Sequence, residues 1–179
     1  LIENNDGWLD PSNKMYIDYY VNYYTNVCRK QKRKCIIFEF GSYMGLSSNY
    51  IANKLRDGDV LYCVDLWDDG GFTIANSLMK KGQNKTVKKL KETLYSQFLV
   101  NTWKHKNKIK PVKMDGRKAM KYLFNMGIKP DLIYLDMDHE FKPVYEDLKT
   151  LLALYPTTTI IGDDYLLFCF VLFSLNCLQ

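Results

Sequence analysis

Short apolar runs alternate with amphipathic segments through most of this chain. Five runs of five or six residues, rich in β-branched and aromatic side chains, are typical of strands that are buried on both faces. They lie at 35–40, 60–65, 109–114, 131–136 and 157–161. Helical spacing of apolar residues predicts helices at 46–56, 85–103 and 117–125, and another from Pro143 onward. A further amphipathic helix begins at Asp10-Pro11-Ser12, before the first strand.

Regular alternation of strand and helix with short connections favours an α/β fold. We predict a doubly wound, mostly parallel sheet of the Rossmann-like type. The 179 residues fit one domain. Its parts are an N-terminal helix with a basic turn (1–34), a core (35–164) and an apolar tail (165–179).

The tail holds twelve apolar residues among its fifteen. It is too short for a membrane-spanning helix, which needs about 20 residues. We expect the C-terminal strands of this sheet type to be missing or replaced. An uncovered sheet edge and an apolar tail would favour a homo-oligomer.

Composition narrows the class of protein. The chain is 47% hydrophobic and 25% charged, which excludes a disordered or collagen-like chain. Its five cysteines form no C-x-x-C pair, which argues against a zinc ribbon or a disulfide scaffold. Together with the lack of a basic-then-apolar leader, they predict a reducing, cytoplasmic location.

The positive charge is concentrated in one segment. Residues 80–113 contain eleven lysines and a single acid, Glu92. Such a block can mark a nucleic-acid surface. Lysine outnumbers arginine 21 to 4, however, and phosphate recognition favours the arginine fork. Nucleic-acid binding is therefore possible but not favoured, and we expect it to be weak and salt-sensitive.

Acidic residues recur where the predicted strands end. In doubly wound sheets, ligands bind at the carboxyl ends of the strands. A row of carboxylates there predicts a site that binds hydroxyls, amines or a cation. Its members are Glu39, Asp65, Asp115, Asp136, Asp163 and Asp164.

A glycine-containing loop closes the first strand with the pattern E-x-G-x-x-x-G-x-S, from Glu39 to Ser47. It is neither the G-x-G-x-x-G dinucleotide fingerprint nor a phosphate loop. Asp65 follows Gly41 by 24 residues, at the end of the second strand. From about Cys35 to Tyr165, the chain resembles the class I S-adenosylmethionine-dependent methyltransferases.

This resemblance implies a set of cofactor-binding residues. The Gly41–Gly45 backbone would hold the amino-acid half of S-adenosylmethionine, with Glu39 beneath it. Asp65 would accept hydrogen bonds from both ribose hydroxyls, and Asp115 would lie by the adenine. The full set is Glu39, Phe40, Gly41, Ser42, Gly45, Ser47, Asp65, Leu66, Asp115, Gly116, Arg117 and Asp136.

Two further patterns concern the chemistry. Asp136 and His139 form D-x-x-H after the fourth strand, and Asp163-Asp164 follow the fifth. They resemble the metal-dependent O-methyltransferases of the macrocin and mycinamicin sugar type. This resemblance implies magnesium or manganese on Asp136, Asp163 and Asp164, and His139 as the general base. As an alternative to metal binding, Asp136 and Asp164 could simply cap the turns that follow them. The Asp138 side chain could stabilise the loop by a hydrogen bond within its own turn.

The function we expect is O-methylation of a small hydroxylated substrate. An RNA methyltransferase is the alternative enzyme, because of the lysines at 80–113. The Asp136-Met-Asp-His stretch lacks the Pro-Pro-aromatic motif typical of enzymes of this fold that methylate base amines. A non-catalytic cofactor-binding or interaction protein is the third possibility, because of the abbreviated C-terminus.

Overall fold

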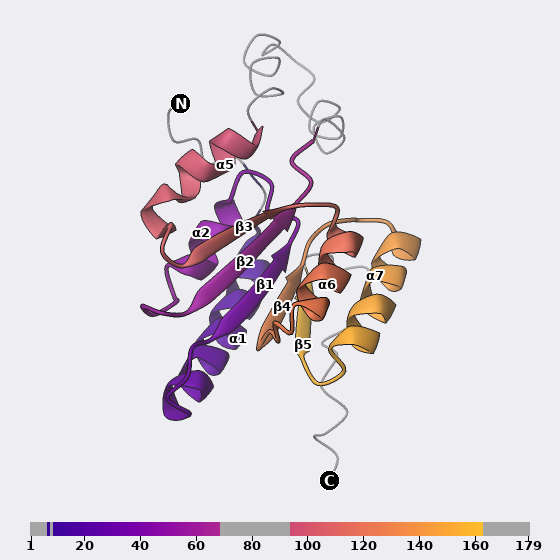
Figure 1. The fold of residues 1–179 in the computed structure, drawn as a ribbon. Helices are drawn as coiled ribbons and strands as arrows, with labels where there is room; N and C mark the ends of the chain where they lie inside the picture. Colours follow the sequence, from indigo (N-terminus) through magenta and orange to yellow (C-terminus); the bar gives the residue numbers. More distant parts are fainter. Residues whose placement is uncertain (1–6, 8, 69–93, 163–179) are drawn as a thin grey trace.

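The structure is a computed structural model that describes residue 7 and residues 9–68 and 94–162 (Figure 1). Within this part of the chain, parallel strands form one sheet in the order β3-β2-β1-β4-β5. The strands are β1 (Ile36–Phe40), β2 (Val60–Asp65), β3 (Ile109–Lys113), β4 (Leu132–Leu135) and β5 (Thr159–Gly162). The predicted parallel α/β sheet is confirmed. The strand order changes direction between β1 and β4, where doubly wound folds place their ligands.

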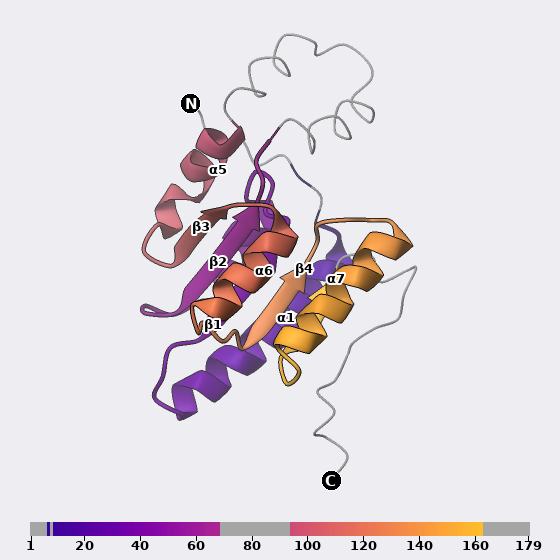
Figure 2. The same cartoon turned by 45° about the vertical axis from the view of Figure 1, so that its right-hand side comes forward.

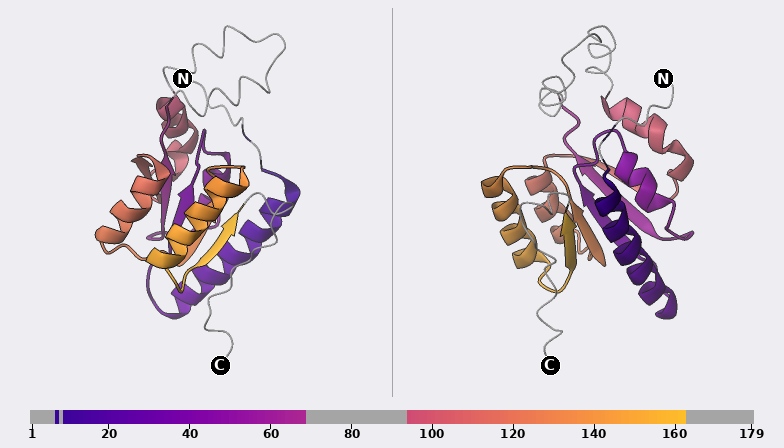
Figure 3. Two further views of the ribbon diagram at one scale, coloured as in Figure 1. Left: turned by 90° about the vertical axis from the view of Figure 1, so that its right-hand side faces the viewer. Right: turned by 180° about the vertical axis from the view of Figure 1, so that it is seen from behind.

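Helices cover both faces of the sheet (Figures 2 and 3). One face carries α1 (Pro11–Lys30), α2 (Leu46–Ala52) and α5 (Leu94–Thr102). The other carries α6 (Gly116–Asn125) and α7 (Phe141–Leu154). Among the described residues, no helix is both long and apolar enough to cross a membrane.

Each face of the sheet has its own hydrophobic core. Ile37 of β1 packs into the cluster with α1, α2 and α5, whereas Phe38 and Phe40 pack into the cluster with α6 and α7. This alternation follows from the two-residue period of a strand. It also places the buried Glu39 on the same side of β1 as Ile37.

Three predicted helices differ from the observed ones. The helix predicted from Pro143 begins two residues earlier, at Phe141, because proline is tolerated throughout the first turn. The helix predicted at 46–56 ends at Ala52, because Arg56 belongs to the turn that leads into β2 and pairs there with Asp59. Of the helix predicted at 85–103, the described part is α5, in which Leu94 and Phe98 are buried as expected. Trp103 does not pack in the core: it begins a short 3-10 turn, is 63% exposed and lies under the Lys106 ammonium.

Gly41 lies where the end of β1 meets the end of β4. Its φ is +93°, and a Cβ at this position would lie 1.8 Å from the carbonyl oxygen of Asp136. Hydrogen bonds from Gly41 N to Val64 O (2.9 Å) and from Asp136 N to Phe40 O (2.8 Å) fix this approach. Only glycine fits, for both its backbone angle and its lack of a side chain.

We expect Gly41→Ala to destabilise the protein more than Gly58→Ala. Gly58 has a similar φ of +90° but nothing within 4 Å of its missing Cβ. Both variants carry the backbone strain, about 1–2 kcal/mol, and only Gly41→Ala adds a clash, worth about 1–3 kcal/mol more. Urea unfolding measures the difference. Equal losses of unfolding free energy in the two variants would contradict this. They would show that the ends of β1 and β4 move apart without cost to accommodate the added Cβ.

Asp59 anchors the turn before β2 from a buried position. Its Oδ1 accepts hydrogen bonds from Cys35 N and the Arg56 guanidinium, both at 2.8 Å, and its Oδ2 accepts from Arg56 N at 2.9 Å. Burial by itself raises the pKa of Asp59. The hydrogen bonds from Arg56 and Cys35 outweigh burial and hold this pKa below its ordinary value of 3.8.

This lowered pKa predicts an acid-dependent loss of stability. A carboxyl group whose pKa is lower in the folded state stabilises fully above its unfolded pKa, and the contribution disappears as pH falls through the folded pKa. We expect Asp59→Asn to lose about 1–3 kcal/mol of unfolding free energy near neutral pH. The gap to wild type should narrow below about pH 4. Asp57→Asn, an exposed neighbour, is the control, and a pH-independent gap would refute the role of the ionised carboxylate.

Candidate functional site

A cavity of about 410 Å³ opens at the carboxyl ends of β1 and β2, beside the start of α6. This volume lies in the range of small-molecule sites. Half of the predicted cofactor-binding residues line it: Gly41, Asp65, Leu66, Asp115, Gly116 and Arg117. Residues that are distant in the sequence thus meet at the carboxyl ends of the strands. The acidic residues after the predicted strands indicate a binding site at this same place.

Asp65 connects the loop after β1 to the turn after β2. Its Oδ2 accepts a hydrogen bond from Tyr43 N at 2.8 Å, and its Oδ1 accepts one from Trp67 N at 2.7 Å. Tyr43 and Trp67 both adopt the left-handed backbone region, with φ of 44° and 45°. Non-glycine residues rarely adopt this conformation, so the carboxylate stabilises both strained positions.

The Asp65 carboxylate keeps acceptor capacity for a ligand. Burial raises the pKa of Asp65 above its ordinary value, while the N–H groups of Trp67 and Tyr43 oppose this shift. The carboxylate oxygens have four lone pairs in all, and three backbone N–H groups, those of Tyr43, Trp67 and Leu66, interact with them. The carboxylate therefore keeps acceptor capacity at the wall of the cavity.

Helix α5 supports the glycine loop from behind. Asn101 donates a hydrogen bond to Met44 O at 2.8 Å. The Trp67 indole donates to Tyr43 O at 2.6 Å, and its ring packs on Phe98 with centroids 4.6 Å apart. These contacts fix the backbone of the loop, whose amides are the groups that could hold a ligand.

Glu39 lies fully buried beneath the same loop. Its Oε2 accepts hydrogen bonds from the hydroxyls of Ser42, at 2.7 Å, and Ser48. Its Oε1 has no hydrogen-bond partner among the described residues. Burial raises the pKa of Glu39, and the neighbouring serine hydroxyls oppose that rise.

Helix α6 begins at the opposite wall of the cavity. Asp115 caps it by accepting a hydrogen bond from Lys118 N at 3.1 Å. A Cβ on Gly116 would lie 1.9 Å from the Met137 sulfur, so glycine lets the loops after β3 and β4 approach each other. The first residues of the helix line the cavity, and the first N–H groups of a helix have no partner within the helix.

Arg117 joins this wall to α7 and to the loop after β4. Its guanidinium donates to the buried Asp147 at 2.6 Å and to Asp138 at 2.9 Å. Burial raises the pKa of Asp147, and the hydrogen bond from Arg117 opposes this rise. Asp138 thus ties the loop after β4 to α6 through Arg117.

The other predicted residues lie around the cavity rather than in its lining. Phe40 is buried in the core below α6 and α7, Gly45 precedes α2 as its N-cap, and Ser47 is buried in the first turn of α2. Asp136 is half-buried after β4, where Tyr134 OH donates to it at 3.5 Å, and His139 is exposed. Asp163 and Asp164 lie outside the described residues.

The cavity also contains residues absent from the predicted cofactor set: Tyr43, Val64, Asp68, Leu94, Met137 and Asp138. Proximity to the motifs could have identified Tyr43 within the glycine loop, and Met137 and Asp138 within the D-x-x-H stretch. No sequence signal identifies Leu94, because α5 reaches the cavity only through tertiary packing.

Comparisons with known proteins agree with this geometry. The family of methyltransferase domains matches residues 38–165 of the chain. An O-methyltransferase from Bacillus cereus, solved in complex with SAH, superposes with a TM-score of 0.53 at 17% identity. The match covers 87% of this chain and 57% of that one. No curated protein matches the sequence.

Two further solved structures share the fold. The O-methyltransferase TomG from Streptomyces achromogenes, involved in tomaymycin synthesis and solved with SAM, superposes with a TM-score of 0.60 at 12% identity, over 89% of this chain and 58% of that one. A putative caffeoyl-CoA O-methyltransferase from Staphylococcus aureus gives a TM-score of 0.51 at 16% identity, over 90% of this chain and 61% of that one. This chain thus spans about three fifths of the length of these structures.

The family match covers the strands, the glycine loop and the cavity together. The chain therefore belongs to the family of methyltransferase domains and has the Rossmann-like fold of the class I S-adenosylmethionine-dependent methyltransferases.

Proposed function

We propose that this chain binds S-adenosylmethionine in the cavity and transfers its methyl group to a hydroxyl oxygen of a small molecule. One observation carries the proposal: a single cavity joins the loop at Gly41, the Asp65 carboxylate and the start of α6. S-adenosylmethionine supplies a methyl group on a positively charged sulfur, ready for in-line transfer. The fold similarity to O-methyltransferases solved with SAM or SAH is consistent with this assignment.

The residues of the cavity suit the parts of this cofactor. Asp65 has acceptor capacity beyond its backbone hydrogen bonds and would accept from the ribose hydroxyls. The Gly41–Gly45 backbone would bind the amino-acid half. Asp115 and the N-terminal amides of α6 would contact the adenine.

Glu39 offers a second test of whether the site suits S-adenosylmethionine. A buried carboxylate oxygen without a partner is costly, and Glu39 Oε1 is one among the described residues. The positive amino group of the cofactor, directly or through an ordered water, would stabilise this oxygen. We therefore assign Glu39 to cofactor binding from beneath the loop.

We further propose a divalent cation and a histidine base beside the cofactor. Leu135 of β4 pairs with Gly162 of β5, and Asp136 and Asp163 are the next residues in the sequence. Carboxylate oxygens are the ligands that magnesium and manganese prefer, so Asp136, Asp163 and Asp164 would hold such an ion. The cation would lower the pKa of a bound hydroxyl, and His139 would accept its proton.

The remaining proposals concern the partners of the chain. A small hydroxylated molecule is the substrate class we infer. Of the lysines at 80–113, five lie in the described part, and three of them contact neighbouring groups: Lys106, Lys108 and Lys113. No observation there favours an RNA substrate over the small molecule. Self-association and a cytoplasmic location stay predictions.

Asp65→Ala tests the cofactor assignment. It should weaken S-adenosylmethionine binding by about 1.5–3 kcal/mol, roughly a 10- to 150-fold rise in Kd, because it removes a charge-assisted acceptor. Asp68→Asn is the matched control, since it removes a negative charge from the same cavity. Calorimetry on folded samples measures both. Equal weakening by the two variants would reduce the role of Asp65 to general electrostatics.

His139→Ala tests the base. It should leave cofactor and metal affinity unchanged and slow methyl transfer by roughly 10²–10⁴-fold, the usual contribution of a general base. His105→Ala is the control, because His105 is the other histidine of the chain and lies in the turn after α5.

Asp136→Asn separates the metal from the base. It should lower magnesium affinity and turnover together. S-adenosylmethionine affinity is titrated separately, because Asp136 also belongs to the predicted cofactor-binding set. If turnover falls without any change in magnesium affinity, the metal proposal fails and His139 remains the sole candidate base.

A further inference from the structure

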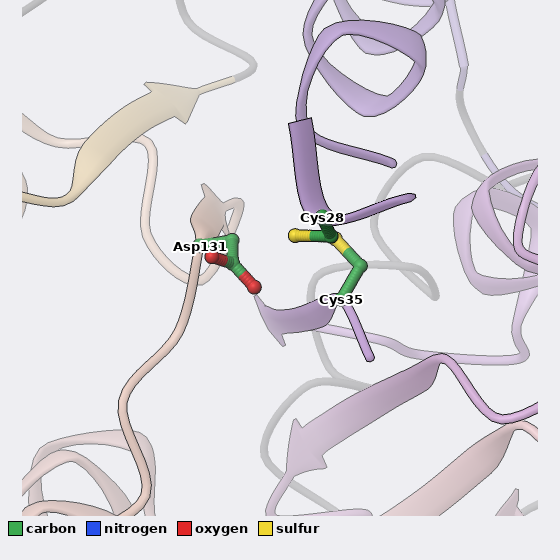
Figure 4. Close-up of side chains that lie close together, drawn as sticks. All are labelled: Cys28, Cys35 and Asp131. Carbon is green, nitrogen blue, oxygen red and sulfur yellow. The ribbon is translucent and has the colours of Figure 1, made fainter. Parts of the chain in front are cut away.

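Two cysteines and an aspartate meet at the amino end of the sheet, far from the cavity at its carboxyl end. Cys28 lies in the last turns of α1, Cys35 directly precedes β1, and Asp131 directly precedes β4. Both sulfurs and a carboxylate oxygen lie within 4.8 Å of one another (Figure 4). Both thiols are fully buried. No other group of this kind occurs among the described residues.

The donor set matches a thiophilic divalent cation. Zinc binds thiolate sulfur at about 2.3 Å and carboxylate oxygen at about 2.0–2.2 Å in tetrahedral geometry. Ligand atoms of such a site lie roughly 3.5–3.8 Å from one another. The three ligand atoms lie within 4.8 Å of one another, so small side-chain rotations would bring them around one ion.

The surrounding charges also suit a zinc ion. Two thiolates and a carboxylate around Zn²⁺ carry a net charge of −1. The Arg33 guanidinium balances it, because it donates to both oxygens of Asp131, at 2.6 and 3.0 Å. Ile36 N donates to Oδ2 at 2.9 Å, so the hydrogen bonds orient the carboxylate as outer-shell partners commonly do.

The acceptor capacity of Asp131 is sufficient for a metal. Oδ2 accepts from Arg33 and Ile36, and Oδ1 accepts from Arg33. The Cys28 thiol also donates to this carboxylate, and metal binding would replace that bond. Since a carboxylate oxygen has two lone pairs, Oδ1 can coordinate an ion without losing its ion pair. Burial raises the pKa of both thiols, with the Asp131 carboxylate contributing.

We propose that Cys28, Cys35 and Asp131 bind one zinc ion that joins the end of α1 to the starts of β1 and β4. Water would occupy the fourth position. The ion would link three elements at the amino end of the sheet, opposite the cavity, and would take no part in methyl transfer. This site is independent of the proposed function, so either can fail without the other.

Cobalt(II) is the probe for the test, because thiolate-to-cobalt charge transfer gives an absorption band in the near ultraviolet. The full chain carries Cys169→Ser and Cys177→Ser, which removes the two cysteines outside the described residues. We expect one cobalt per chain, a thiolate band, and displacement of cobalt by zinc. Zinc at 100 times its Kd should raise the folded-to-unfolded ratio about 100-fold.

Single substitutions then locate the site. Cys28→Ser and Cys35→Ser should each reduce the thiolate band and abolish the zinc-dependent rise in stability. Cys63→Ser, a buried cysteine in β2, is the matched control and should preserve both. Asp131→Asn should weaken zinc binding while the thiolate band persists. Circular dichroism confirms that each variant is folded.

Three results would overturn the proposal. The first is the absence of a thiolate-to-cobalt band when the reduced Cys169→Ser, Cys177→Ser chain is titrated with cobalt. This result alone would suffice, without the single substitutions. The second is a band that persists in Cys28→Ser and Cys35→Ser but disappears in Cys63→Ser. The third is a mass two daltons lower in the freshly purified chain, with peptide mapping that links Cys28 to Cys35, which would identify a disulfide pair instead.

Discussion

The Asp65 carboxylate is the contact on which the cavity depends. Its two oxygens hold Tyr43 and Trp67, one residue from each loop, and both of these have left-handed backbone angles. Such angles cost about 1–2 kcal/mol per non-glycine residue, and a hydrogen bond to a charged acceptor returns about 1.5–3 kcal/mol. The Trp67 indole completes the unit by donating to Tyr43 O. One side chain therefore shapes both loops and still has acceptor capacity at the wall of the cavity.

The two ends of the sheet have different roles, with the cavity at the carboxyl end and the carboxylates Asp59 and Asp131 at the amino end. At the carboxyl end, Gly41 and Gly116 let backbone and side chains approach closely enough to form a cavity. At the amino end, Asp59 and Asp131 accept hydrogen bonds from the backbone at the start of β1. The buried helix-and-sheet cores between them keep these two regions apart. Substitutions at one end can therefore be interpreted with little interference from the other.

Sequence patterns predicted the strands well, because each strand is an apolar run with distinct turn residues around it. They also predicted that Asp65, Asp115 and Gly41 lie close together, because the carboxyl ends of parallel strands lie at the same end of the sheet. Local sequence patterns did not predict the features that depend on tertiary contacts. Trp103 has helical spacing but lies exposed at the end of α5. The left-handed angles of Tyr43 and Trp67 depend on Asp65, and no local propensity indicates them. Cys28, Cys35 and Asp131 are spread over more than a hundred residues and form no motif.

Binding of the demethylated cofactor product tests the central claim most directly. Calorimetric titration of the folded wild-type chain with S-adenosylhomocysteine, with NAD in a parallel titration, requires no acceptor substrate and no metal. The cavity around Asp65 and Gly41 predicts saturable binding of one S-adenosylhomocysteine per chain and none of NAD. A folded sample that binds no S-adenosylhomocysteine, or that prefers NAD, would contradict the account.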